Sequence, residues 1–261
     1  MSDRHVIQAA EVEFEYRPGQ PVLRGASLTA SAGKLVCVLG PNGSGKTTLL
    51  RCLLGQLRPC GGRILLDGKP LGRYSPRGLA RLMAYVPQTP RSAFAFTVQE
   101  LVLMGRLAHT GLLGLAGAQD LAVARQAMIM TGTLPFVSRT LEELSGGEAQ
   151  CAMIARALAQ QPSVMLLDEP TSQLDIRNQL QIHRMMQRLA HDWGMAVVCI
   201  SHDVNLAARF ADELALMREG QVLAAGQPLD VMREDILEKT YDVHVELIRA
   251  GDDPIPFLRA R

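Results

Sequence analysis

Residues 35–50 read LVCVLGPNGSGKTTLL and indicate a strand, a glycine-rich loop and a helix in immediate succession. The run 35–39 is apolar throughout, as expected of a buried strand. After the loop, leucines recur at the spacing of one helix face, namely Leu49, Leu50, Leu53, Leu54 and Leu57. This succession favours an α/β fold.

The loop matches G-x-x-x-x-G-K-[ST], the P-loop pattern that binds nucleotide phosphates. Its glycines let backbone N–H groups turn inward around a phosphate, and the next helix points its positive dipole end at the same place. We expect Lys46 to reach the β- and γ-phosphates of ATP and the Thr47 hydroxyl to bind Mg²⁺. The predicted nucleotide contacts are Gly40, Pro41, Asn42, Gly43, Ser44, Gly45, Lys46, Thr47 and Thr48.

A second apolar run, residues 164–167, ends in two carboxylates, Asp168 and Glu169. Ligands of open α/β sheets bind beyond the carboxyl ends of the strands. We therefore expect Asp168 to bind Mg²⁺, directly or through water, and Glu169 to polarise an attacking water. The structural alternative is an acidic strand end that meets solvent, and the P-loop upstream makes that alternative the weaker one.

These two motifs occur in many P-loop NTPases, and Leu144-Ser145-Gly146-Gly147-Glu148 narrows the class. Ser145 and Glu148 form a capping box for a helix predicted from Gly147 to Gln160. A cap does not need two glycines, whereas an anion that approaches backbone N–H groups does benefit from them. The motif resembles the signature sequence of ATP-binding-cassette (ABC) ATPases.

In that family the signature contacts the γ-phosphate held by a second subunit. The resemblance, which covers nearly the whole chain, thus implies a head-to-tail homodimer in which Ser145, Gly146 and Gly147 take part in two shared ATP sites. Glu148, Cys151 and Gln173 differ from residues that are common at these places, without removing a catalytic group.

Further single residues match positions of the ABC family. Gln88 resembles the Q-loop glutamine, which touches Mg²⁺ and the attacking water. His202 follows the apolar run 196–200 and stands at the switch position, which implies a γ-phosphate contact. Asp175 resembles the D-loop aspartate at the dimer interface, with a helix N-cap as the alternative. Tyr16 matches the aromatic that stacks on adenine, with ordinary packing as the alternative.

Composition limits the classes of partner. The 261 residues include 27 basic and 26 acidic side chains, so the net charge of +1 gives no pull toward nucleic acid or anionic membranes. We expect no nucleic-acid partner. No uncharged stretch reaches the ~18 apolar residues of a membrane span, and the first residues do not resemble a signal peptide. The five cysteines show no C-x-x-C pairing, which is typical of a reducing cytosol.

The order of patterns predicts the organisation of the chain. Residues 6–30 alternate and, with 62–66, indicate an antiparallel subdomain. The pattern turns helical from about residue 97, which resembles the helical subdomain of ABC ATPases. We predict one ABC ATPase domain over residues 4–250, with the helical subdomain at about 97–146, and a tail at 251–261. Near the end of the domain we expect one helix over 228–240 and a weak strand over 243–248.

The subfamily is indicated by residues 96–106, with Ser75-Pro76-Arg77 and Leu174-Asp175-Ile176. These segments resemble the ATPases of importers for iron–siderophore, haem and vitamin B12, and molybdate importers look similar. The resemblance implies a subunit on the cytoplasmic face of the inner membrane. There it would drive a separate permease that is fed by an extracytoplasmic binding protein.

Two other classes remain open. Exporter ATPases share every catalytic motif, and only residues 97–106 argue against them. ABC ATPases of DNA repair or translation carry long coiled coils or two cassettes, and this chain shows neither. The transported molecule never touches a subunit of this kind, so no residue of the chain identifies it.

Overall fold

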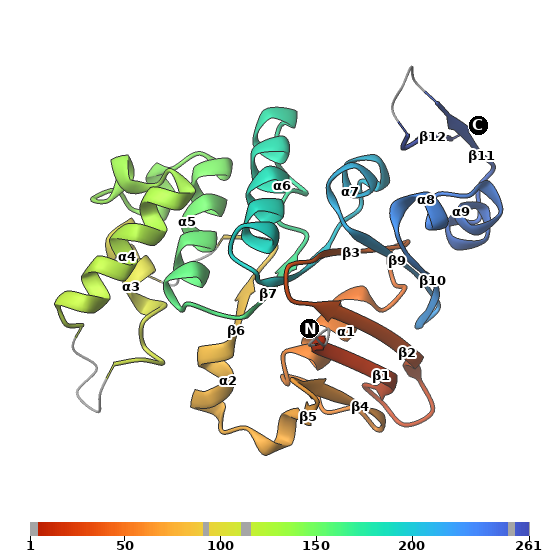
Figure 1. Cartoon of the computed structure of the whole chain (residues 1–261), viewed down its shortest axis with the longest axis horizontal. Coiled ribbons are helices and arrows are strands. Elements are labelled where there is room, and N and C mark those ends of the chain that lie inside the picture. The colour runs from red at the N-terminus through yellow and green to blue at the C-terminus, as the bar shows by residue number, and fades with distance from the viewer. Residues whose placement is uncertain (1–4, 91–93, 111–115, 250–253, 261) are drawn as a thin grey trace.

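In the computed structural model, residues 5–90, 94–110, 116–249 and 254–260 are described (Figure 1). Within these residues, six strands form a central sheet: β3 (Leu35–Leu39), β6 (Met83–Val86), β7 (Val164–Asp168), β8 (Ala196–Ile200), β9 (Glu213–Arg218) and β10 (Gln221–Gly226). Their spatial order is β10-β9-β3-β8-β7-β6, and all neighbours are parallel except β9 and β10. The apolar runs that predicted buried strands lie at the centre of this sheet, which confirms the α/β class.

A second, antiparallel sheet covers one face of the first. Its strands are β1 (His5–Glu15), β2 (Pro21–Ser31), β4 (Gly61–Leu66) and β5 (Lys69–Pro70), in the order β2-β1-β4-β5. It shares an apolar core with α1 (Lys46–Leu53) and the central sheet, for example through Leu23, Leu49 and Leu166. The alternation of residues 6–30 predicted β1 and β2, and residues 62–66 predicted β4; both predictions are confirmed. The short β5 was not predicted.

Helices cover the other face and both ends. They are α2 (Pro76–Leu82), α3 (Val98–Met104), α4 (Ala118–Thr131), α5 (Gly146–Ala159), α6 (Ile176–His191), α7 (Val204–Phe210), α8 (Pro228–Val231) and α9 (Glu234–Tyr241), with short 3₁₀ turns η1 (Leu71–Arg73), η2 (Leu134–Phe136) and η3 (Leu141–Glu143). Alternate residues of β3 face opposite layers, because side chains of a strand alternate. Leu35, Cys37 and Leu39 pack with the core of α5, α6 and α7. Val36 and Val38 pack with the core of the antiparallel sheet.

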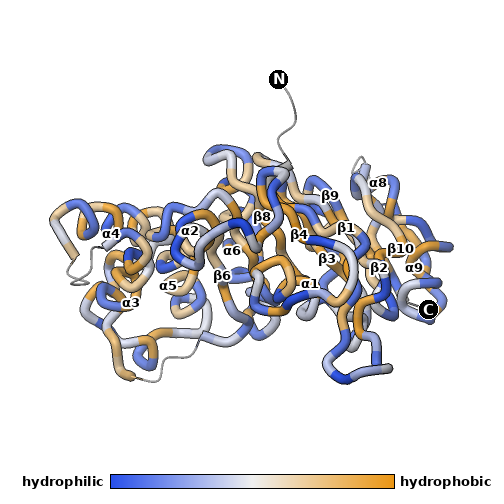
Figure 2. Tube along the Cα trace, turned by 90° about the horizontal axis from the view of Figure 1, so that it is seen from below, coloured by the Kyte–Doolittle hydropathy of each residue, from blue (hydrophilic) through white to orange (hydrophobic). Residues whose placement is uncertain are grey.

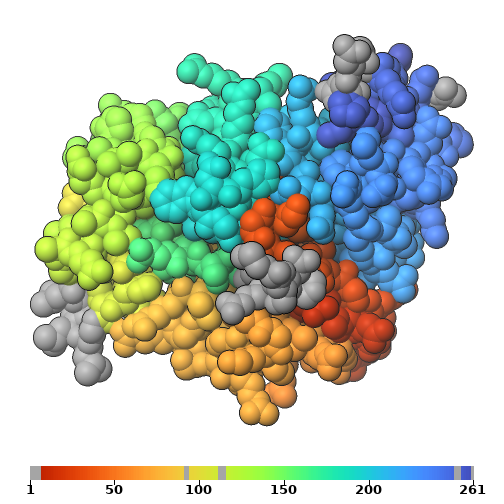
Figure 3. Space-filling model, in the orientation of Figure 1, coloured from red at the N-terminus to blue at the C-terminus, as the bar shows by residue number. Residues whose placement is uncertain are grey.

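The helical region expected after residue 97 is present. α3, α4 and α5 pack together beyond β6, at the opposite end of the molecule from α8 and α9 (Figures 1 and 3). Thr97 is the N-cap of α3 and forms a capping box with Glu100. Hydrophobic residues follow the central strands, and hydrophilic ones gather in the outer loops (Figure 2). The boundaries 4–250, 97–146 and 251–261 stay predictions.

The expectation of one helix over 228–240 is wrong. α8 ends at Val231, and α9 begins at Glu234, because Met232 and Arg233 leave the helical backbone region. The weak strand is β11 (Val245–Ile248), which pairs with β12 (Phe257–Ala260), a strand that the sequence did not predict. None of the helices in the described ranges combines the length and hydropathy that crossing a bilayer requires.

Candidate active site

The P-loop connects β3 to α1 and is held by close backbone packing. Gly40 has φ of 145°, and a Cβ there would lie 2.1 Å from the Met217 carbonyl oxygen of β9. Gly45 has φ of 99° and caps α1, where a Cβ would lie 2.9 Å from a methyl of Leu23. Only glycine fits either position, so these two residues fix the path of the loop into the helix.

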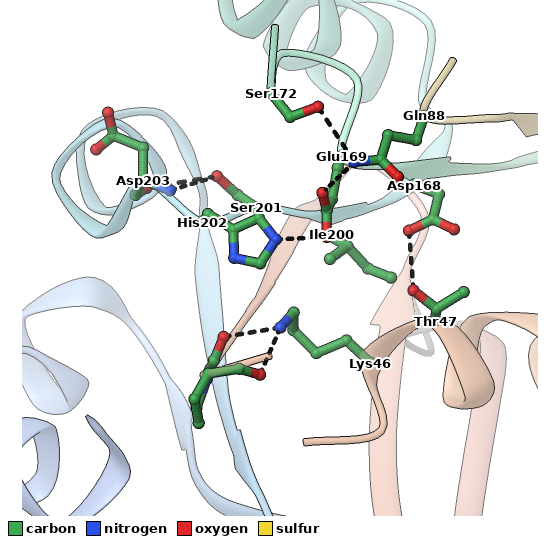
Figure 4. Close-up of polar contacts among 12 residues, drawn as sticks. Lys46, Thr47, Gln88, Asp168, Glu169, Ser172, Ile200, Ser201, His202 and Asp203 are labelled. Carbon is green, nitrogen blue, oxygen red and sulfur yellow. Dashed lines mark hydrogen bonds and ion pairs between the residues drawn. The ribbon is translucent and has the colours of Figure 1, made fainter. Parts of the chain in front are cut away.

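Lys46 folds over its own loop (Figure 4). Its Nζ donates to the carbonyl oxygens of Gly40 at 2.7 Å and Pro41 at 2.9 Å. Burial lowers the pKa of this ammonium, and the nearby charges of Glu169 and Asp168 oppose that effect. The Ser44 hydroxyl in the same loop is buried without a hydrogen-bond partner in the described part of the chain. A buried cation beside an unpaired hydroxyl fits a phosphate group.

Asp168 lies at the carboxyl end of β7, facing the start of α1. The Thr47 hydroxyl donates to its Oδ1 at 3.3 Å, and the Tyr85 hydroxyl to its Oδ2 at 3.4 Å. Burial raises the pKa of the Asp168 carboxyl, and both hydrogen bonds oppose the rise. A cation beside Asp168 would stabilise its ionised form.

The donors around Asp168 fit Mg²⁺. No cluster of three His, Cys, Asp or Glu side chains suited to a metal occurs among the described residues. Mg²⁺ commonly takes one or two protein oxygens and completes its shell with phosphates and water. The Asp168 carboxylate and the Thr47 hydroxyl supply oxygens of this kind next to the P-loop.

Glu169 is the centre of a second group of contacts (Figure 4). Its Oε1 lies 2.5 Å from His202 Nε2, and its Oε2 accepts from Gln88 Nε2 at 2.7 Å. Gln88 also donates to the Ser172 hydroxyl at 3.4 Å. Glu169 has a left-handed backbone with φ of 47°, although it is not glycine. The sheet thus brings together side chains that follow β6, β7 and β8.

The signature residues lie apart from the P-loop of the same chain. No hydrogen bond within the described ranges joins the start of α5 to residues 40–48. The predicted capping box is present: Ser145 N donates to Glu148 Oε2 at 2.8 Å, and Glu148 N donates to Ser145 Oγ at 3.4 Å. α5 begins at Gly146, one residue before the expected start. The Ser145 hydroxyl, which donates to Glu148 Oε2 at 2.7 Å, and the Ser145 N–H lower the pKa of the Glu148 carboxyl.

The positions of Asp175 and Tyr16 also fit purely structural roles, a helix N-cap for Asp175 and ordinary packing for Tyr16. Asp175 caps α6 by accepting from Asn178 N at 2.8 Å. Tyr16 is 55% exposed, packs edge-on against Phe14 and lies 3.4 Å from the Thr48 hydroxyl. It therefore lies beside the first turn of α1 with much of its ring free to contact a ligand. A nucleotide role for either residue stays a prediction.

Sequence reasoning did not single out Tyr85 or Ser172 as site residues. Both contact predicted site residues through their hydroxyls. Tyr85 carried one signal, since it is a polar aromatic at the end of a strand just before Gln88. Ser172 is the first residue of the D-loop match 172–175, but its contact with Gln88 depends on how the loop after β7 turns.

Comparisons with known proteins agree on one family. A family model described as ABC transporter matches residues 23–172. The chain is 40% identical over 255 residues to the hemin import ATP-binding protein HmuV of Burkholderia thailandensis, covering 91% of this chain and 93% of that protein. It is also 40% identical to HmuV of Escherichia coli O157:H7, covering 92% and 94%.

Solved structures show the same fold. A metal-chelate type ABC transporter in an inward-facing conformation matches with a TM-score of 0.85 and 29% identity, covering 99% of this chain and 97% of that one. A bacterial Atm1-family ABC exporter with ATP bound matches with a TM-score of 0.74 and 27% identity, covering 88% of this chain and 40% of that one. The fold alone therefore does not separate importers from exporters.

Proposed function

Because this chain belongs to the ABC transporter family, we propose that it is the ATPase subunit of an importer for haem or a related metal chelate, such as an iron–siderophore or cobalamin. Like other ABC ATP-binding proteins, it hydrolyses ATP to power transport. The observation that supports the proposed catalytic roles is the meeting of Lys46, Asp168 and Glu169 with Gln88 and His202 at one edge of the sheet.

Each side chain has a task in hydrolysis. Lys46 leaves the carbonyls of its own loop and binds the β- and γ-phosphates of ATP. Thr47 and Asp168 would hold Mg²⁺, with Gln88 as a further ligand, and the cation would offset phosphate charge. Glu169 orients or deprotonates the attacking water, and the His202 ring, already at its carboxylate, faces the γ-phosphate.

A second copy of the chain completes the site. The start of α5 is not joined to its own P-loop by a described hydrogen bond, and Gly146 is exposed there. Gly147 is buried against the Asn178 side chain, and only glycine allows this close approach. In a head-to-tail dimer, Ser145 and the first backbone N–H groups of α5 would contact the γ-phosphate held by the other copy. Asp175 would lie at the same interface, and Tyr16 would stack on the adenine.

The partner is an integral-membrane permease, and the chain lies on it at the cytoplasmic face of the inner membrane. The helical region and the segment after Gln88 would receive the permease's cytoplasmic helices. Phe94 is 71% exposed there and packs edge-on against Phe96, with ring centroids 5.7 Å apart. An extracytoplasmic binding protein would deliver the substrate. The fold match to an exporter structure supports the alternative that the chain powers export. The similarity to hemin import proteins over most of both chains favours import.

Co-purification tests the import proposal. A tagged Glu169→Gln chain, expressed in the native cell and extracted with its membranes, should recover a polytopic permease without a cassette of its own, together with a binding protein. Phe94→Ser combined with Phe96→Ser is the matched control and should recover much less permease. Recovery of an exporter-type permease, or of soluble partners only, would contradict import while leaving the ATPase assignment intact.

A further inference from the structure

One short segment contacts both carboxylates of the site. The Tyr85 hydroxyl lies 3.4 Å from Asp168 Oδ2, and Gln88 Nε2 lies 2.7 Å from Glu169 Oε2. The two contacting residues are only three positions apart, at the end of β6 and in the loop that follows it. Gln88 belongs to the loop, whereas Tyr85 belongs to the strand and contacts Asp168 from there.

The position of Tyr85 is fixed by the sheet. β6 pairs with β7 in parallel, and Tyr85 lies opposite Leu166, two residues before Asp168. The Tyr85 ring packs against the apolar core that the antiparallel sheet covers. A ring anchored in this way leaves little freedom to its hydroxyl, which points at the carboxyl end of β7.

Each oxygen of Asp168 has one hydroxyl donor. The Thr47 hydroxyl, in the first turn of α1, donates to Oδ1, and the Tyr85 hydroxyl, in β6, donates to Oδ2. Thr47 is itself an expected Mg²⁺ ligand, so its hydroxyl oxygen would turn toward the cation when Mg²⁺ is bound. Tyr85 would then remain as the protein donor that orients the carboxylate. Residues that hydrogen-bond to a metal ligand without touching the metal fix the orientation of that ligand.

We propose that Tyr85 is a positioning residue that orients the Asp168 carboxylate for Mg²⁺. The inference rests on the proposed role of Asp168 as a Mg²⁺ ligand. It adds a residue of the central sheet to the groups that determine how Asp168 holds the metal.

The test compares nucleotide binding with and without metal. Binding of the non-hydrolysable ATP analogue AMP-PNP to the full chain is measured by calorimetry, in Mg²⁺ and in EDTA. Tyr85→Phe keeps the ring and removes the hydroxyl. It should reduce the gain in affinity that Mg²⁺ gives by about 3- to 10-fold and leave the affinity in EDTA unchanged. Tyr74→Phe is the matched control, since the Tyr74 hydroxyl donates to the Leu66 carbonyl outside the site, and it should behave as wild type.

Two results would overturn the role of Tyr85. One is a Tyr85→Phe chain with the full Mg²⁺-dependent gain, and the other is an equal loss of affinity in Mg²⁺ and in EDTA, which would indicate a merely structural role. Asp168→Asn separates this failure from failure of the premise. If that variant keeps the full gain, the assignment of Asp168 is itself wrong and the inference fails with it. If it loses the gain while Tyr85→Phe does not, only the inference fails.

Discussion

Glu169 adopts a left-handed backbone conformation that costs a non-glycine residue about 1–3 kcal/mol. The conformation places its side chain between Gln88 and His202, which come from different loops. The sequence predicted all three residues from motifs that lie far apart in the chain. It could not predict that Glu169 contacts the other two directly, because that depends on the loop path after each strand.

We expect the buried His183 to make the free energy of unfolding depend on pH. It is fully buried on α6, its Nδ1 pairs with the Gln179 carbonyl at 2.9 Å, and its Nε2 has no partner in the described structure. Burial lowers the pKa of the ring below its ordinary 6.5, against the Gln179 hydrogen bond and the charge of Asp203. Below pH 6.5 the unfolded chain therefore binds a proton that the folded chain resists, and the free energy of unfolding falls with falling pH.

Urea unfolding at several pH values checks this expectation. Below pH 6.5, His183→Leu should flatten the decline by up to about 1.4 kcal/mol per pH unit, the contribution of one proton. Met186→Leu is the control, since Met186 is a buried side chain of the same helix that does not titrate, and it should leave the slope unchanged. Equal slopes for wild type and His183→Leu would show that His183 does not carry the effect.

At the scale of elements, two helices begin with the same kind of capping box, but only one of the two caps lies at the proposed ATP contact. Thr97 caps α3, and Ser145 caps α5, each with a glutamate three residues on. Replacing either with alanine should lower the free energy of unfolding by about 0.5–2 kcal/mol. Only Ser145→Ala should also lower ATP turnover, because the start of α5 is the part proposed to contact the γ-phosphate. Urea unfolding and a steady-state ATPase assay on both variants separate the two effects. Equal turnover losses would count against a special role for Ser145.

Elements with a strong local pattern were predictable, and elements that depend on distant contacts were not. The apolar strands and the glycine-bounded α1 follow from local sequence. The β11–β12 hairpin is instead fixed by α7: Asn205 Oδ1 accepts from Leu258 N at 2.7 Å, and its Nδ2 donates to the Leu258 carbonyl at 3.2 Å. The sequence of residues 254–260 alone does not predict a strand, because the strand depends on pairing with β11 and on the hydrogen bonds from Asn205.

At the scale of the whole molecule, the catalytic groups and the signature belong to different regions. The P-loop, Asp168 and Glu169 lie at the edge of the central sheet, whereas Ser145 begins a helix that packs with α3 and α4. One chain therefore supplies half of each proposed site. The family resemblance predicted this division, and the local patterns alone could not, because the missing half would come from another copy.

The proposed dimer can be tested by measuring the molar mass of the protein with and without ATP. Two ATP molecules bound between two Glu169→Gln chains would each contact both copies, so unhydrolysed nucleotide should favour the dimer by mass action. Removing the carboxylate should lower turnover by about 100-fold or more. Size-exclusion chromatography with light scattering should then show a monomer without nucleotide and a dimer with ATP and Mg²⁺. Lys46→Ala is the control, because it loses a phosphate contact and should stay monomeric at the same ATP concentration. A Glu169→Gln chain that binds ATP yet keeps the monomer mass would show that the γ-phosphate is not shared between copies.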